Sequence, residues 1–187
     1  MKKDKIIRII PLDLQKFAEE LEAVQGKRII YLYRIYEATA TTDAKAIAFA
    51  TENENSLSRD AEVTQTKNGP IRTPGAIEIE VSLTSILAKG DDMIEKVKKA
   101  VIDGSLVELW EVNLDEEGET ENVGKYKATY YQGYFSELSI TSNAEESVEV
   151  SMTFGPNGTG ASGYATVTDD QQEIASYAFK DTKKESE

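Results

Sequence analysis

The sequence contains no cysteine and no histidine among its 187 residues. The lack of cysteine excludes a disulfide framework, a thiolate nucleophile and any metal site built on thiolates. The lack of histidine removes the usual general base near neutral pH and the commonest metal ligand. An enzyme with this composition would depend on carboxylates, lysine, serine or tyrosine. We therefore expect a protein that is not an enzyme and that uses no cofactor or metal.

Long hydrophobic runs are also missing. No stretch of 18 apolar residues occurs, so no membrane-spanning helix is predicted. The apolar patch near the N-terminus is interrupted by Arg8 and Pro11, and no small-residue cleavage site follows it. We therefore do not predict a signal peptide. We expect the chain to fold and act in the cytosol, or to be released from it by lysis, with no membrane partner.

Basic residues are scarce, because 21 Lys and Arg stand against 34 Asp and Glu and the net charge is −13. Residues 1–10 carry four basic residues and one acidic residue, a charge of +3, so the remainder carries −13 − 3 = −16. Binding to nucleic acid depends on neutralising phosphates, so a body this acidic should repel DNA. The charge has two interpretations: ordinary solubility, or a surface past which DNA slides without binding.

Alternating apolar and polar residues predict several short strands. The clearest strand is at residues 77–84, where Ile77, Ile79, Val81 and Leu83 alternate with polar residues. Segment 28–36 is apolar on both faces, so both of its faces should be covered. Further strands are expected at residues 46–51, 106–112, 126–134, 135–141 and 147–154, with a bulge or bend at Gly133.

One helix is predicted among these strands, at residues 91–103. Its apolar stripe is Ile94, Val97 and Val101, and Gly104 follows as a helix-ending residue. Thr168 and Gln171 have the spacing of a capping box for a second, short helical segment. The pattern predicts a mainly β fold, an antiparallel β-sandwich or open barrel with one flanking α-helix.

A polar segment at residues 52–75 is predicted as a long loop, because it is longer than a passive connection needs to be. The turn signals Asn68-Gly69-Pro70 and Pro74-Gly75 indicate a hairpin excursion with its tip near Lys67–Pro70.

The two ends of the chain are predicted to lie outside a single β domain at residues 26–180. Residues 1–25 are expected to form an N-terminal arm and a short helix, and residues 181–187 a flexible tail. The isoleucines of the arm have no obvious local partner, so we expect them to contact a neighbouring molecule. They are Ile6, Ile7, Ile9 and Ile10.

Three patterns that could carry chemistry have simpler explanations. The glycines of residues 158–163 match a dinucleotide fingerprint, but no βαβ unit surrounds them, so a flexible loop is expected. The acidic run at residues 115–121 lacks the spacing of a calcium loop and is expected to be a solvated turn. Two of the three carboxylates of Glu78, Glu80 and Glu149 could form the pair that hydrolyses glycosides, but no aromatic sugar platform accompanies them, so a hydrated sheet face is favoured.

Several segments together resemble one known family. They read T-K-N-G-P-I-R-T-P-G, T-S-I-L-A-K-G-D, V-E-L-W-E-V, K-Y-K-A-T-Y-Y-Q-G-Y and F-G-x-N-G-x-G-A-S-G-Y-A-T. Over residues 25–183 the chain resembles the major tail proteins of bacteriophages with long, non-contractile tails (siphophages), the subunits that stack into the tail tube. The resemblance implies a β-sandwich with a flanking helix. It also implies hexameric rings that stack into a tube through which DNA passes during ejection.

The resemblance also implies partners, a location and roles for particular residues. The partners are further copies of the chain, the tape measure protein, and the tail-tip and tail-terminator proteins, with DNA only as unbound cargo. The location is the virion tail, after assembly in the host cytoplasm. Glu78, Glu80 and Glu149 become candidates for the lumen face. The inter-subunit loop would use Arg59, Asp60, Lys67, Asn68, Gly69, Pro70, Arg72 and Pro74.

A different class of protein stays open, a monomeric β-sandwich module for binding or adhesion. A signal peptide or an aromatic sugar platform would have favoured it, and neither is found in the sequence. Polymerisation is the observation that separates the two classes.

Overall fold

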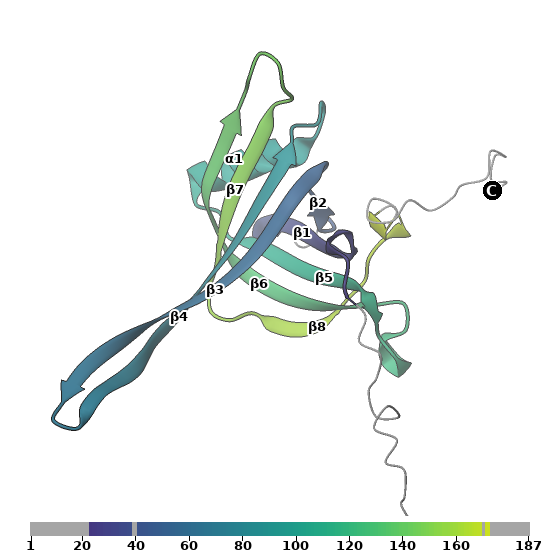
Figure 1. Cartoon of the computed structure of the whole chain (residues 1–187). Coiled ribbons are helices and arrows are strands. Elements are labelled where there is room, and N and C mark those ends of the chain that lie inside the picture. Colours follow the sequence, from purple (N-terminus) through teal and green to yellow (C-terminus); the bar gives the residue numbers. More distant parts are fainter. Residues whose placement is uncertain (1–22, 39–40, 170, 173–187) are drawn as a thin grey trace, which may run out of the picture.

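The computed structural model describes residues 23–38, 41–169 and 171–172. Within them the chain is mainly β, with one flanking α-helix, as predicted (Figure 1). The strands are β1 (Ile29–Ile35), β2 (Lys45–Ala46), β3 (Ala50–Thr66), β4 (Gly69–Ile86), β5 (Val107–Glu117), β6 (Tyr126–Thr141), β7 (Glu149–Pro156) and β8 (Ala161–Ala165). The helix is α1 (Asp92–Asp103), and the short 3-10 turns are η2 (Gly26–Arg28), η3 (Tyr36–Ala38) and η4 (Thr120–Asn122).

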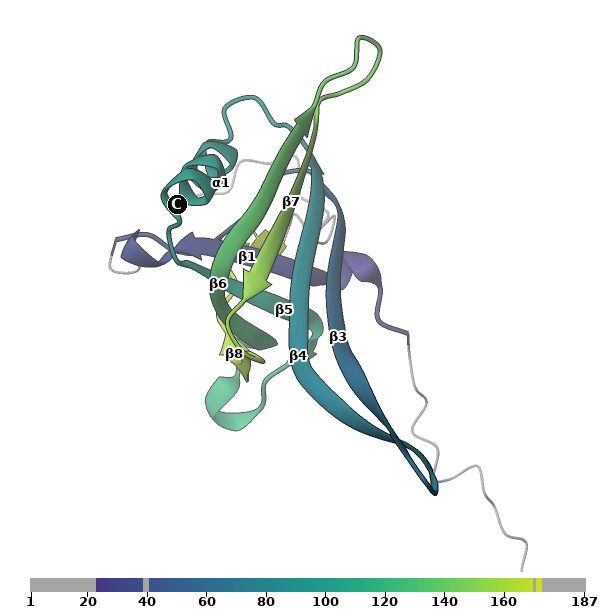
Figure 2. The ribbon, with the colours of Figure 1, turned by 90° about the vertical axis from the view of Figure 1, so that its left-hand side faces the viewer.

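All strands belong to one antiparallel sheet that bends at β6 and does not close. The order is β2-β1-β5-β6-β7-β4-β3, and β8 pairs with the first part of β6. Residues 126–133 of β6 pair with β5, and residues 133–141 pair with β7, so Gly133 pairs with both strands. We call β2, β1, β5, β8 and the first part of β6 the body half, and β3, β4, β7 and the second part of β6 the hairpin half. The strands of the two halves run in clearly different directions (Figure 2).

The bend places Gly133 where the two halves meet. A Cβ atom on this residue would lie 2.1 Å from the carbonyl oxygen of Gly155 on β7, so no other residue fits without a shift. The bulge that was expected there lies slightly further on, between Phe135 and Glu137. The segments expected as two strands, 126–134 and 135–141, are therefore one strand, because the bend and the bulge turn the chain without interrupting its pairing.

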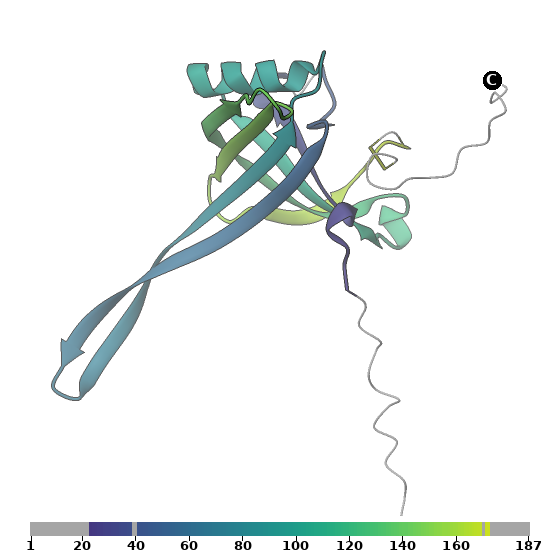
Figure 3. The ribbon, with the colours of Figure 1, turned by 45° about the horizontal axis from the view of Figure 1, so that its top comes forward.

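The main core lies between the two halves, and α1 covers one side of it (Figures 1 and 3). Phe135 is central, with ring centroids 5.6 Å from those of Tyr33 and Phe154. The helix contributes Met93, Ile94, Val97 and Ala100 to this core.

Local sequence explains where α1 begins and ends. The Asp91 side chain accepts a hydrogen bond of 2.8 Å from the backbone N–H of Met93, which caps the first turn. Gly104 then adopts a left-handed conformation with φ of 65°, which ends the helix. The helix predicted at residues 91–103 is confirmed.

A second cluster covers the other face of the body half. Leu32, Val112, Leu114 and Ala128 are buried there with Val167 from the chain beyond β8. Strand β1 is therefore covered on both faces, as its double-sided apolar pattern predicted, because Tyr31 and Tyr33 face the main core.

Beside this second cluster lies a buried ion pair. The guanidinium of Arg34 donates a 2.7 Å hydrogen bond to Glu108, whose side chain is only 5% exposed. Tyr130 donates to the same carboxylate at 2.7 Å, and Arg34 lies 4.9 Å above the ring centre of Trp110. Burial, together with the hydrogen bond to Glu108, raises the pKa of Tyr130.

Further predicted segments differ from the structure. Residues 161–163 of the glycine-rich segment, expected as a loop, belong to β8, and residues 115–117 of the acidic run, expected as a turn, belong to β5. Residues 52–75, expected as a loop, are the paired strands of a long hairpin, with its tip at Lys67 and Asn68 as the turn signals indicated. The strand expected at residues 46–51 is divided, because β2 ends at Ala46 and β3 begins at Ala50. Phe49 between them has a φ of 51°, which breaks the extended backbone.

No helix in the described ranges has the length and apolar composition that crossing a membrane requires.

Candidate functional site

The hairpin half has an outer face, turned away from the core, that carries carboxylates. Val81, Leu83 and Ser85 of β4 are buried toward the core, so the residues that alternate with them point outward. Residues directly opposite in antiparallel strands share a face, which adds positions from β3, β6 and β7. The glutamates of this acidic face are Glu52, Glu54, Glu78, Glu80, Glu137 and Glu149.

The rest of the acidic face consists mainly of hydroxyl side chains. No Lys or Arg occupies an outward position of this face. This holds for Glu52–Ser58 of β3, for Glu78–Ile86 of β4, and for the residues of β6 and β7 that pair with each other. The six glutamates are therefore neighbours of one sign on an exposed surface, which raises the local negative potential. The hydroxyl residues are Ser56, Ser58, Ser82, Thr84, Ser139, Thr141, Ser151 and Thr153.

The structure brings together the three glutamates that the sequence singled out and adds three more. Glu78, Glu80 and Glu149 share this face, although Glu149 belongs to a strand far away in the chain. Glu52 and Glu54 were missed because their segment was assigned to a loop. Glu137 was missed because the bulge beside it hides its register. The alternation of Glu52, Glu54 and Ser56 with asparagines was the available signal for the first two.

Both edges of the hairpin half are open. Among the described residues, β3 pairs with β4 alone, and residues 137–141 of β6 pair with β7 alone. An open edge presents unpaired N–H and C=O groups in the geometry that another strand can use. The acidic face is thus bounded on two sides by strands that can each accept a further strand.

Strand β3 is joined to the body half through polar groups. Asn55 on its inner face donates a 2.6 Å hydrogen bond to Glu111 and a 3.2 Å hydrogen bond to the hydroxyl of Tyr131. Tyr31 donates to the same Glu111 carboxylate at 3.0 Å. Burial, reinforced by the charge of Glu111, raises the pKa of Tyr31. These bonds hold an otherwise polar strand against the core.

The hairpin of β3 and β4 extends well beyond the body (Figures 1 and 3). At its tip, the hydroxyl of Thr66 donates to the carbonyl of Gly69 at 2.7 Å and accepts from the backbone N–H of Asn68 at 3.3 Å. Gly69 has a φ of 118°, a conformation that favours glycine. The turn is therefore built by its own residues and does not depend on the body.

The predicted inter-subunit residues all lie on this projecting part of the hairpin. Its charged residues are exposed, and none of them forms an ion pair with another described residue. They are Arg59, Asp60, Lys67 and Arg72, together with Glu62, which the sequence did not single out. Val63 is 41% exposed and Ile71 57% exposed, so the projection also presents apolar side chains. The predicted arm contacts, Ile6, Ile7, Ile9 and Ile10, lie outside the described residues.

The described residues contain no metal-binding site of the usual kind, because no three acidic side chains among them lie close enough together to hold an ion. The glutamates of the acidic face are spread along the strands instead.

Comparison with known proteins assigns this architecture to a class of structural phage proteins. The family model described as "Phage tail tube protein" matches residues 23–162. A protein of Staphylococcus phage phiMR25 named "Putative tail protein" is 31% identical over 158 residues, which is 83% of this chain and 81% of the phage protein. The chain belongs to the phage tail tube protein family, and the predicted resemblance is confirmed.

Solved structures agree on the fold. The tail tube subunit of SPP1, determined by solid-state NMR and cryo-EM, superposes with a TM-score of 0.67 at 21% identity, covering 84% of this chain and 91% of that subunit. A tail protein of a gene transfer agent particle superposes with a TM-score of 0.57 at 14% identity, covering 77% of this chain and 100% of that one. Our chain therefore has the tail tube fold.

Proposed function

We propose that copies of this chain associate edge to edge into hexameric rings, and that the rings stack into the tail tube through which DNA leaves the virion. One observation carries the proposal: the acidic face belongs to the half of the sheet whose two edges are open. Joining the edge of β3 to the β6 edge of the next copy would continue the sheet around a ring. The gene transfer agent tail with the same fold was refined with C6 symmetry, which supports the number six.

The acidic face is the surface that would line the lumen. Carboxylates repel the phosphates of DNA, whereas a basic wall would bind them and release counterions. Charges act over a Debye length of about 8 Å at physiological salt, which is sufficient in a narrow channel. DNA is thus cargo and not a bound partner, and the function requires no catalytic step.

The projecting hairpin would connect one ring to the next. Its charged residues are free of ion pairs with the described part of the chain, and Val63 and Ile71 are exposed. Charge pairs and apolar contacts with a neighbouring copy would satisfy both. The arm with Ile6, Ile7, Ile9 and Ile10 would contact a neighbouring copy in the same way.

Other tail proteins would meet the tube at its inside and its ends. The tape measure protein would lie in the lumen, and the tail-tip and tail-terminator proteins would cover the two end rings. Assembly would take place in the host cytoplasm, and the finished protein would reside in the virion tail.

Electron microscopy tests the proposal directly. We expect negative-stain images of the concentrated protein, alone or seeded with short tail tubes, to show rings or hollow tubes. A protein that stays monomeric under both conditions would overturn the proposal and favour the monomeric binding or adhesion module instead.

Charge reversal tests the lumen assignment. In the phage, Glu78→Lys with Glu80→Lys should leave tubes intact and slow DNA ejection, measured by dye uptake on the released DNA. The matched control is Glu119→Lys with Glu121→Lys, which reverses two exposed charges near η4, outside the acidic face. Equal ejection rates in wild type and the first variant would refute the lumen assignment.

Shortening the hairpin tests its connecting role. Residues 61–65 and 70–74 are cross-strand partners, so deleting both segments keeps the Thr66–Gly69 turn and the register of the remaining strands. We expect a folded subunit, because the deleted part lies outside the core, and no tubes in electron micrographs. Tubes of normal length from this variant would show that another element joins the rings.

A further inference from the structure

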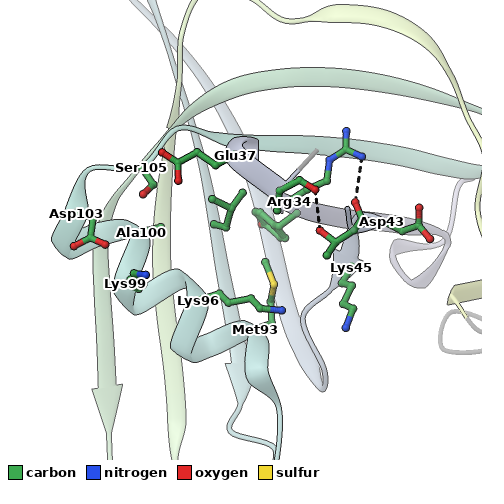
Figure 4. Close-up of a pocket in the computed structure, with 14 residues that line it drawn as sticks. Arg34, Glu37, Asp43, Lys45, Met93, Lys96, Lys99, Ala100, Asp103 and Ser105 are labelled. Atoms are coloured by element: carbon green, nitrogen blue, oxygen red, sulfur yellow. Dashed lines mark hydrogen bonds between the residues drawn. The ribbon is translucent and has the colours of Figure 1, made fainter. Parts of the chain in front are cut away.

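A groove lies on the body half, away from the acidic face and the hairpin. It has a volume of about 250 Å³ and runs between α1, the end of β1 and the segment before β2 (Figure 4). Tyr33, Ile35, Met93 and Ala100 give it an apolar lining. Concave apolar surfaces with a few charged groups at the border are typical of binding sites for a side chain or a peptide.

Most cations at the border of the groove already have partners. Arg34 is paired with Glu108 at 2.7 Å, and Lys96 donates to Asp92 at 2.5 Å, with Lys45 4.0 Å from the same carboxylate. The hydrogen bond from Lys96 lowers the pKa of Asp92. The remaining basic side chain is Lys99.

Unlike most of the cations, three carboxylates at the border of the groove form no ion pair with a described residue. Glu37, Asp43 and Asp103 line the groove, and none of them makes an ion pair with another residue of the described part of the chain. Figure 4 shows them around the opening, Glu37 and Asp103 on one side and Asp43 on the other. The groove therefore combines an apolar lining with more unneutralised negative charge than positive charge.

The described chain ends beside this groove. The side chain of Gln171 donates a 2.9 Å hydrogen bond to the carbonyl of Ala44. Ala44 stands between Asp43 and Lys45, which both line the groove. Thr168 and Gln171 also exchange the two hydrogen bonds of the predicted capping box, so this anchoring point is locally fixed.

The chain beyond Gln172 has the matching chemistry. It contains Tyr177 and Phe179, followed by Lys180, Lys183 and Lys184. Tyr177 follows Gln172 by five residues, which can span about 17 Å when extended. Aromatic side chains bury a large apolar area and suit a lining such as that of this groove.

We propose that residues 174–184 of the same chain bind in this groove, with the aromatic side chains against its lining and the lysines opposite its carboxylates. The segment directly before the described residues is a poorer match. Residues 14–24 carry Glu19, Glu20 and Glu22, and they enter the described structure at the start of β1, whereas the groove lies at its end.

Cysteine cross-linking tests the proposal in dilute, monomeric protein, so the result does not depend on tube formation. The natural sequence has no cysteine, so each introduced pair is unique. The test pair is Thr42→Cys in the groove with Ala178→Cys. The control pair is Ser58→Cys on the hairpin with Ala178→Cys. A short bifunctional maleimide should join the test pair within one chain at roughly ten times the control yield, because binding raises the effective concentration.

Equal yields for the two pairs would overturn the proposal. Cross-links that form only between chains would also overturn it, since they would assign the groove to a second copy.

A charge variant examines the lysine contacts. Glu37→Gln, Asp43→Asn and Asp103→Asn together should lower the cross-linking yield severalfold. The control neutralises Glu119, Glu121 and Glu145, three exposed carboxylates elsewhere, by substitution with glutamine. A yield that is unchanged in the first variant, or equally reduced in both, would remove charge pairing from the proposal.

Discussion

The two halves of the sheet differ in their outer faces, because one is buried and the other is exposed. The body half buries its outer face under residues such as Val167, and its edge strands are the short β2 and β8. The hairpin half leaves its outer face exposed, with glutamates and hydroxyls, and both of its edges open. The same strand, β6, takes part in both halves.

The contacts that stabilise one subunit and the groups that are available for association with another therefore lie on different surfaces. A half with two covered faces can fold within one chain, because its apolar side chains find partners there. A half with one polar face and two open edges has its remaining hydrogen-bonding capacity in the plane of the sheet. Both halves contribute to the main core of the folded subunit, and the hairpin half in addition presents the open edges that further copies would extend in the proposed ring.

The largest expected effect comes from placing a charge on each outer face in turn. Leu32 is 3% exposed on the outer face of the body half, so Leu32→Asp buries an unpaired carboxylate and should cost about 4 kcal/mol or more. Thr84→Asp on the acidic face should leave a folded subunit. Urea denaturation followed by circular dichroism measures both. Similar urea midpoints for the two variants would contradict the claim that one outer face is buried and the other is exposed.

The next effect concerns the carboxylates of the two halves. Arg34→Ala leaves Glu108 buried without this cation and should lower the free energy of unfolding by about 3 kcal/mol. Glu80→Gln on the acidic face should change it by no more than about 0.5 kcal/mol. The double variant Arg34→Met with Glu108→Gln should regain much of the loss in the same urea assay. A mild Arg34→Ala would show that the pair is dispensable.

A third effect is a pH dependence of the body half. Burial raises the pKa of Tyr33 above its ordinary value of 10.0, so the folded state keeps a proton that the unfolded state loses. Stability is then complete below about pH 10 and falls as the pH rises further, by about 1.4 kcal/mol per pH unit for one such tyrosine. Burial raises the pKa of Tyr31 and of Tyr130 as well, so Tyr33→Phe should lower this slope but not remove it, when wild type and variant are compared by urea denaturation between pH 8 and 11. Identical slopes would refute the assignment to Tyr33.

The smallest effect on the subunit itself is expected at an open edge. Ile140 on the second part of β6 is 47% exposed, so Ile140→Lys should alter subunit stability by only about 0.5 kcal/mol. It should nevertheless reduce tube formation, because lysine on an edge strand opposes strand addition. Ile102→Lys on α1, where the residue is 75% exposed, is the matched control. Normal tubes from Ile140→Lys would indicate that this edge is not an interface.

Local patterns predicted the elements that depend on local chemistry. The helix at residues 91–103 was predictable from its capping aspartate, apolar stripe and terminal glycine, which act within one or two turns. The covered strand β1 was predictable from its double-sided apolar pattern.

The errors arose where pairing overrides composition. Strand β3 is polar throughout much of its length, so it was predicted as a loop, yet its backbone is satisfied by the register with β4. Only three of the six glutamates of the acidic face were predicted. Glu52 and Glu54 were missed because they become part of this face only through the pairing of β3 with β4. Glu137 joins it through a bulge that no local pattern indicated.

Composition and short-range spacing were sufficient to predict a mainly β, acidic protein with a turn at Lys67–Asn68, and composition alone showed that it has neither cysteine nor histidine. Those properties follow from side-chain chemistry and from interactions between residues close together in the chain. The bend at β6, the shared acidic face, the two open edges and the groove beside α1 required the folded arrangement. Each of these depends on which distant strands are neighbours, and that choice is made by the packing of the whole sheet around one core.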